Sequence, residues 1–297
     1  MLDPARLRVL VEIGHAGSIT AAAARLAFTP SALSQQLAKL ERELGCRLVE
    51  RGPTGVTLTR QGKVLLRHGE RVVGELRDAE RAVRASIEAE PESLAIGTFS
   101  SAGQALVPEA LAALRERHPR ARLSLVDIEP PGGYGLVTSR DLDVLITHRY
   151  PGTNLPPDNG LHRSRLLADP LRLVLPAGHP KATGKIGLRD LRDEDWISGA
   201  SGVANRVCLE LLFSQAHIRP HVAYETGDYG VTLALVAAGL GISLVPMTLL
   251  RDVDRERLAV RALPGARPQR EIFVVHRKRP QRLVAELVGL LTPDRTG

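Results

Sequence analysis

"FTPSALSQQLAKLERELG", residues 28–45, carries the clearest helical pattern in the first part of the chain. Thr29 and Pro30 are typical of the start of an α-helix, and Gly45 is typical of its end. Between them, leucines recur at intervals of four, three and four residues, at Leu33, Leu37, Leu40 and Leu44. This spacing predicts a helix over 30–44 whose leucine stripe faces a core.

The opposite face of this helix is polar, and its side chains are mostly short. It consists of Ser31, Gln35, Ala38 and Arg42, with Ser34 and Lys39 at its margins. Solvated helix faces favour long Glu and Lys side chains, whereas hydroxyl and amide groups can read base edges in a DNA groove. For this segment alone two interpretations stay open: an ordinary solvated face, or a surface that recognises DNA.

The neighbouring segments predict a winged helix-turn-helix unit over residues 1–58. Asp3 can cap a helix over 4–14, and a second, alanine-rich helix is expected over 19–27. After the third helix, residues 47–59 form two extended runs around a turn rich in glycine and proline. Three helices joined by tight turns, followed by such a hairpin, are typical of this unit.

One long helix is predicted over 59–90, with Thr59 as its cap. Small and apolar residues recur in it at intervals of three and four, at Gly62, Leu65, Gly69, Val72, Leu76, Ala79, Val83 and Ser86. A seam of this kind packs against another helix. We favour dimerisation through the seam; the alternative is that the helix packs on its own globular domain.

From residue 91 onward, alternating strand-like and helix-like runs predict an α/β fold. One βαβαβ unit uses SLAIGTF, RLSLVDI and DVLITH as strands, and a second uses LRLVLP, DWIS, HVAYET and ISLVP. The strand EIFVVHR and a helix over 280–291 follow. We expect two lobes, about 91–160 with 268–297 and about 161–267. Ligands of such sheets gather at strand ends, here in the cleft between the lobes.

Composition narrows the classes of function. The chain has 297 residues, of which 43% are hydrophobic, and its net charge of +7 is denser in the first 90 residues than in the remainder. This balance favours a nucleic-acid partner, although charge alone does not separate DNA from RNA or from an acidic membrane surface. Aromatic residues make up only 3%, which argues against a base-stacking single-strand binder. Without a signal-peptide pattern or an apolar run of about 20 residues, we expect a cytoplasmic protein with no membrane partner.

The run ITAAAARLAFTPSALSQQLAKLERELGCRLVERGPTGVTLTRQG, residues 19–62, resembles the N-terminal domain of a LysR-type transcriptional regulator. VAAGLGISLVP, residues 236–246, is similar to the family's run before its last lobe crossing, so the resemblance covers essentially the whole chain. It implies a helical winged domain, a dimerising linker helix over 59–90, and a two-lobed α/β effector domain over 91–297 that resembles a type 2 periplasmic binding protein. It also implies double-stranded operator DNA as a partner, assembly as a homodimer or a homotetramer, and RNA polymerase as a further candidate partner.

In a domain of this kind, the quoted helix enters the DNA groove. Free N–H groups at its start suit a phosphate, so Thr29 and Ser31 are expected to contact the DNA backbone. Ser34 and Gln35 are expected to reach base edges, with Gln35 suited to adenine. Many family members carry glutamine where this chain has Pro30, so that base contact is not carried over to this site.

Basic residues farther along complete the expected DNA interface. Lys39 and Arg42 follow on the helix, and Arg51 lies at the wing turn. We expect phosphate or minor-groove contacts from these side chains rather than sequence reading.

The resemblance also points to an effector site. In the family, polar residues at three places face the effector: the turn GTFSSAGQ, the end of the strand DVLITH and the loop GASGV. On this chain they are Ser100, Ser101, Thr147 and Ser201. N–H groups at the start of a helix favour a small anionic effector, whereas the alternative for the two serines is that they only cap the helix. His148 can add a charge that changes with pH.

Three other classes of protein explain the sequence less well. The chain contains no GxSxG, Walker or HExxH motif and no paired Cys/His ligands, so we expect no enzyme, metal or cofactor. A solute-binding protein needs an export signal and leaves the first 90 residues unused. A redox sensor usually has a second cysteine nearby, so we expect Cys46 and Cys208 to serve in core packing.

Overall fold

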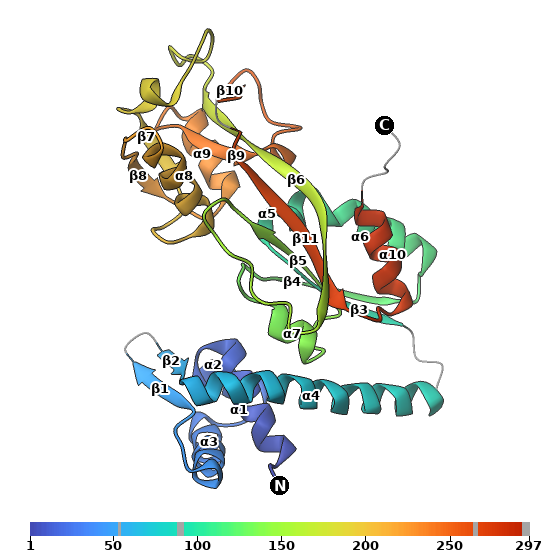
Figure 1. The fold of residues 1–297 in the computed structure, drawn as a ribbon. Helices are drawn as coiled ribbons and strands as arrows, with labels where there is room; N and C mark the ends of the chain where they lie inside the picture. Colours follow the sequence, from blue (N-terminus) through green and yellow to red (C-terminus); the bar gives the residue numbers. More distant parts are fainter. Residues whose placement is uncertain (53–54, 88–91, 264–266, 293–297) are drawn as a thin grey trace.

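The computed structural model describes residues 1–52, 55–87, 92–263 and 267–292. It contains a small helical unit at the N-terminus, a long helix that runs out of this unit, and a larger part built on a sheet (Figure 1). The sheet-containing part lies along one side of the long helix, and the third helix of the N-terminal unit lies on the other side.

Three helices form the N-terminal unit: α1 (Pro4–Ala16), α2 (Ile19–Arg25) and α3 (Pro30–Leu44). Each begins at a side chain that accepts a backbone N–H group, and these caps are Asp3, Ser18 and Thr29. α3 ends at Gly45, whose φ of 67° lies in the left-handed region that glycine favours. The helices predicted in this region are therefore confirmed, together with the start and end of α3.

The predicted wing follows as two antiparallel strands, β1 (Val49–Gly52) and β2 (Gly55–Leu58). Its tip, residues 53–54, lies outside the described residues. The N–H group of Val56 donates to the carbonyl oxygen of Gly17 at 3.0 Å, which attaches the wing to the end of α1.

The leucine stripe of α3 faces the core over most of its length. Leu33, Leu37 and Leu40 are buried and pack in one cluster with Leu10 of α1. Leu44 differs from the expectation, because its side chain is 38% exposed. It is the last helical residue before the chain turns at Gly45, so the stripe ends one leucine earlier than its spacing suggests.

The long helix is α4 (Arg60–Ile87), and Thr59 caps it by accepting the N–H of Gly62 at 3.0 Å. The last residues of the predicted helix, 88–90, lie outside the described part of the chain. α4 packs against α1, and Arg77 in its second half still lies 3.8 Å from Glu12 of α1.

The seam predicted along α4 divides into two halves. Gly62 and Gly69 are buried against the N-terminal unit, where a Cβ added at Gly69 would lie 3.0 Å from Val11 of α1. Farther along, Val72 and Leu76 are 40% and 46% exposed. The first half thus packs on its own domain, as the alternative held, and the second half leaves an apolar strip on the surface.

The larger part begins with three parallel strands in the order β5–β3–β4. These are β3 (Ser93–Thr98), β4 (Arg122–Asp127) and β5 (Val144–Arg149). Between them lie α5 (Ser100–Ala105), α6 (Val107–Arg117) and α7 (Tyr134–Thr138), which confirms the first predicted βαβαβ unit.

Two long antiparallel strands, β6 (Leu161–Pro176) and β11 (Gln269–Arg277), connect this sheet to a second lobe (Figure 1). β6 pairs with β11 as far as Pro170 and then with β9 (Ser243–Pro246) and β10 (Leu258–Arg261). Only the second half of β6 was predicted, because charged and polar residues interrupt the apolar pattern of its first half.

The rest of the second lobe comprises η1 (Leu188–Leu191), β7 (Asp195–Ser198), α8 (Ala204–Ser214), β8 (His221–Glu225), α9 (Tyr229–Ala237) and η2 (Met247–Leu249). β7 and β8 pair in parallel, and α10 (Arg282–Leu291) returns to pack on α6 of the first lobe. Each lobe has its own buried clusters, with Ile96 and Leu287 in the first and Trp196 and Phe213 in the second. The two-lobed α/β fold is therefore confirmed.

Both cysteines contribute to packing. Cys208 of α8 is buried in the cluster of Trp196, and burial raises the pKa of its thiol to about 11. Cys46 is half-buried against the N-terminal core. A thiol with so high a pKa is a poor nucleophile at neutral pH, which argues against redox sensing by Cys208. Within the described residues, no helix is both long and apolar enough to cross a bilayer.

Candidate functional site

The outward face of α3 is the first candidate surface. Thr29, Pro30 and Ser31 lie exposed at the start of the helix, and Gln35 and Lys39 lie exposed on the turns that follow. Because the first N–H groups of a helix have no intrahelical partner, this end carries a partial positive charge that suits a phosphate. The hydroxyl of Thr29 accepts one of these groups, from Ala32, at 3.1 Å.

The wing lies beside this face and adds cationic side chains. Nη2 of Arg51 in β1 donates to the hydroxyl of Ser34 in α3 at 3.4 Å. A hollow of about 340 Å³ lies between the helix and the wing, lined by Ser34, Leu37, Ala38, Glu41, Arg47, Val49 and Arg51. Both arginines are exposed. The predicted residues Ser34 and Arg51 are thus brought together, and Arg47 is a neighbouring cation that sequence reasoning did not single out.

A buried carboxylate holds the wing against α3. Oε1 of Glu41 accepts the N–H group of Leu48 at 2.8 Å and that of Val49 at 3.4 Å. Glu41 lies among the core leucines of α3, so its burial depends on these bonds. They fix the position of the wing, and with it Arg51, relative to the polar face of α3.

The second candidate site lies at the start of α5. Ser100 is exposed and Ser101 is buried. Phe99 occupies the capping position of this helix and makes no side-chain capping bond, so neither serine acts as its cap. The hydroxyl of Ser101 instead accepts a hydrogen bond from Nη1 of Arg270 at 2.8 Å.

Arg270, at the second position of β11, is the centre of a buried polar network that joins both lobes. Its side chain is only 1% exposed and pairs with Asp169 of β6, with Nη2 and Oδ2 at 2.9 Å. Asp169 also accepts from the hydroxyl of Thr248 in η2 at 2.8 Å. Since Ser101 belongs to the first lobe and Thr248 to the second, Arg270 links the two lobes through hydrogen bonds.

Two tyrosines complete this network. The hydroxyl of Tyr150, just after β5, lies 2.9 Å from that of Tyr229 at the start of α9, and Arg270 lies over the Tyr150 ring. Burial raises the pKa of both phenols, so they stay neutral. Burial alone would lower the pKa of Arg270, but the carboxylate of Asp169 opposes this, so the pKa stays raised and the guanidinium stays charged.

The remaining predicted residues lie apart from this network. Thr147 of β5 is buried, and its hydroxyl has no hydrogen-bond partner among the residues that the structure describes. Because strand side chains alternate, it shares the face of Leu145, which packs toward α7, whereas His148 lies on the other face with Ile146. Ser201 is exposed in the loop between β7 and α8. No hydrogen bond joins these two to Ser100 or Ser101 among the four described side chains.

His148 contacts the aromatic residues around Arg270. Its ring lies edge-on to those of Phe99 and Tyr150, with centroids 4.5 and 5.1 Å away. Burial lowers the pKa of His148, although Glu129, with Oε2 at 3.6 Å from Nε2, partly opposes this.

Sequence reasoning missed Arg270, although a signal was present. In REIFVVH, residues 270–276, Arg270 shares the inward face with Ile272 and Val274 at a spacing of two. A charged side chain at an inward position of a strand requires a buried partner. Asp169, the partner, lies 101 residues earlier in a strand half that was itself not predicted.

Protein-family models match both the N-terminal part and the larger part of the chain. The family model described as bacterial regulatory helix-turn-helix protein, lysR family, matches residues 4–63. The model described as LysR substrate binding domain matches residues 88–293.

Individual relatives match over most of their length. The transcriptional regulator CbbR of Xanthobacter flavus is 31% identical over 94% of this chain and 83% of its own. BsdA of Bacillus subtilis, also named a transcriptional regulator, is 30% identical over 84% of this chain and 85% of its own.

Solved structures show the same fold. A full-length variant of OxyR from Pseudomonas aeruginosa has a TM-score of 0.66 at 21% identity, over 99% of this chain and 98% of that one. CbnR, solved in complex with its target DNA, has a TM-score of 0.57 at 23% identity, over 98% of this chain and 99% of that one. The relatives are named as regulators rather than as enzymes. The chain therefore belongs to the LysR family of DNA-binding transcriptional regulators and carries the family's substrate-binding domain.

Proposed function

We propose that this regulator reads a specific duplex sequence with α3, and that a small anionic effector between the two lobes changes its binding to DNA. The observation that carries the first half is the exposed polar face of α3 beside Arg51 of the wing. The proposed DNA contacts are Thr29, Pro30, Ser31, Ser34, Gln35, Lys39 and Arg51. The fold of CbnR, solved with its target DNA, supports this use of the N-terminal domain.

The proposed effector contacts are Ser100, Ser101, Thr147 and Ser201. Ser101 is the best supported of them, because its hydroxyl accepts from Arg270 and so keeps its own proton available for an anion. Arg270 supplies a positive charge, of which Asp169 neutralises part. An anion that accepts a hydrogen bond from Ser101 alters the hydrogen bonds that join the two lobes. Its binding therefore favours a different angle between the lobes.

The proposed assembly is a homodimer or a dimer of dimers. Two recognition helices about 34 Å apart on one face of DNA require a two-fold partner. The exposed strip of Val72 and Leu76 on α4 offers a surface for it. We keep residues 1–58, 59–90 and 91–297 as the proposed DNA-binding, linker and effector domains, acting in the cytoplasm with RNA polymerase as a further candidate partner.

Substitution of Ser101 tests the effector site. A panel of small carboxylates and inorganic phosphate is titrated calorimetrically against the parent protein, and each binder is then titrated against Ser101→Ala. We expect affinity to fall by about 1–2 kcal/mol, as for loss of a hydrogen bond to a charged group, with DNA affinity unchanged in the absence of ligand. Thr57→Ala, at an exposed position of the wing strand β2, serves as a control that should leave effector binding intact. Equal affinities for parent and Ser101→Ala would move the pocket to other residues.

A further inference from the structure

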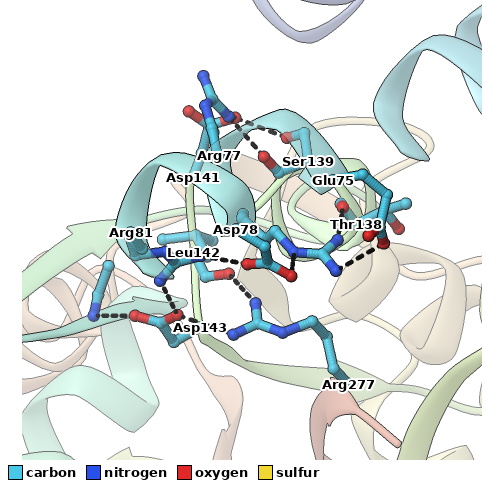
Figure 2. A network of polar contacts seen from close by, with 12 residues as sticks. Glu75, Arg77, Asp78, Arg81, Thr138, Ser139, Asp141, Leu142, Asp143 and Arg277 are labelled. Atoms are coloured by element: carbon cyan, nitrogen blue, oxygen red, sulfur yellow. Dashed lines mark hydrogen bonds and ion pairs between the residues drawn. The ribbon is translucent and has the colours of Figure 1, made fainter. Parts of the chain in front are cut away.

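The second half of α4 is in contact with the effector domain of the same chain, at α7 and the loop that leads into β5. Figure 2 shows arginines and carboxylates from both sides of this contact pointing toward one another. Nη1 of Arg77 lies 2.5 Å from Oδ2 of Asp141 and also donates to the carbonyl of Ser139 at 2.6 Å. In the reverse direction, Arg140 of the effector domain donates to Glu75 of α4 at 3.0 Å and pairs with Asp78.

A third arginine reaches into the effector-domain sheet. Nη1 of Arg81 donates to Oδ1 of Asp143 at 3.3 Å. The Asp143 side chain is only 4% exposed; it also accepts from the backbone N–H of Ala95 at 3.0 Å and from Arg277 at 3.1 Å. Isolated surface ion pairs add little stability, but pairs that share partners and include a buried carboxylate are less screened by solvent. Arg81 therefore anchors α4 to a fixed point of the sheet.

The backbones on both sides are shaped for this contact. A Cβ added at Gly74 of α4 would lie 2.5 Å from the carbonyl oxygen of Thr138, so only glycine lets the two elements approach this closely. Arg140 adopts a φ of 64°, in the left-handed region that non-glycine residues rarely occupy. Its side chain bonds both to α4 and to the carbonyl of Thr138, at 3.1 Å. Surrounding contacts of this kind keep a residue in an unfavourable conformation.

The contact uses a different face of α4 from the apolar strip. At about 100° per residue, Gly74, Asp78 and Arg81 fall on one side of the helix, whereas Val72 and Leu76 fall on the opposite side. The effector domain therefore leaves the strip uncovered, in agreement with its exposure. It also leaves α3 uncovered, because α3 lies on the far side of α1 and α4 (Figure 1).

We propose that Arg77, Arg81 and Arg140, with their carboxylate partners, form a latch that holds the effector domain on the linker helix of its own chain. The α4 latch makes the DNA-binding unit and the effector domain move as one body at low ionic strength. A change in the effector domain then reaches α3 through α4 of the same chain. High salt screens the ion pairs and releases the latch, whichever effector the protein binds.

Hydrogen–deuterium exchange on the full-length protein tests the latch. The observed amides are those of residues 135–143, and the comparison is between low salt and about 1 M NaCl, where the screening length is about 3 Å. We expect these amides to exchange about tenfold faster at high salt, while the buried amides of α1 keep their protection.

Two variants separate the latch from folding. Arg140→Gly removes the charged side chain and suits the left-handed backbone, so it does not strain the loop. Gly74→Ala adds one methyl group to the contact and is favourable for the helix itself. Both are expected to show the fast exchange already at low salt, and Arg67→Ala, an exposed arginine of α4, is expected to behave as the parent. Exchange unchanged within about twofold at both salt concentrations and in both variants would overturn the proposal.

Discussion

Gln35 is the side chain on which the proposed reading of bases depends most. It is exposed on the outer face of α3, and an amide can make two hydrogen bonds to adenine. Gln35→Ala is expected to weaken binding to a specific site by about 1–3 kcal/mol and to relax the preference for one base pair. Footprinting at fixed salt on the preferred site and on single-base variants measures both effects.

Arg51→Ala provides the contrasting control for Gln35. Loss of a phosphate contact should weaken all duplexes to a similar degree and reduce the dependence of affinity on salt. If Gln35→Ala bound the preferred site as tightly as the parent, the base-reading role would have to be assigned elsewhere on α3.

His148 predicts a pH dependence of stability. Burial lowers its pKa in the folded protein below the ordinary value of 6.5, so the folded state takes up a proton less readily than the unfolded chain. The free energy of unfolding is therefore unaffected by His148 above about pH 6.5. It decreases as the pH falls from there through the lowered pKa of the folded state.

Urea unfolding at pH 7.5 and pH 5 measures this effect. The parent is expected to lose more stability on acidification than His148→Gln, which cannot take up the proton. Equal losses for the two proteins would show that His148 does not contribute to the acid sensitivity.

Single residues were predictable where local rules place them. Thr29, Pro30 and Gly45 were assigned correctly because helix caps depend on residues within one turn of each other. Arg270 was missed because its role depends on Asp169, which is distant in the sequence. The inward position of Arg270 on its strand is a local signal, but no local pattern indicates which strand carries its partner.

At the scale of elements, the exposed strip of α4 is the feature with the clearest consequence. Leu76→Lys places a charge in the apolar strip and is expected to break the dimer, which halves the mass measured by light scattering. Arg67→Glu, which changes the charge at an exposed position on the opposite side of the same helix, serves as the control and is expected to leave the mass unchanged. A variant that keeps both its fold and the parent mass would place the interface elsewhere.

Helices of the N-terminal unit and α4 were predicted well because their caps and periodicity are strong local signals. β10 and the first half of β6 were not predicted. Residues 161–170 pair with β11 and mix charged and apolar side chains, because buried and exposed positions alternate along this half of the strand. The division of the seam into a buried and an exposed half was also not predictable. Gly62 and Val72 fit the same spacing, but Gly62 is buried and Val72 is exposed.

For the whole molecule, the two lobes were expected from the alternation of strands and helices and from the family resemblance. The side of α4 on which the effector domain lies was not predictable from either. It depends on Gly74 and Arg140, which are distant in sequence and fit together only in the folded chain.

Binding of specific duplex sites through α3 is tested most directly by sequencing the genomic DNA fragments that the purified full-length protein retains. We predict a small set of enriched fragments that share a two-fold motif, with half-sites about one or more helical turns apart. The same experiment with Gln35→Ala should lose or blur this motif while non-specific retention remains. Retention of DNA in proportion to the input, with no shared motif for the parent protein, would show that α3 reads no specific sequence.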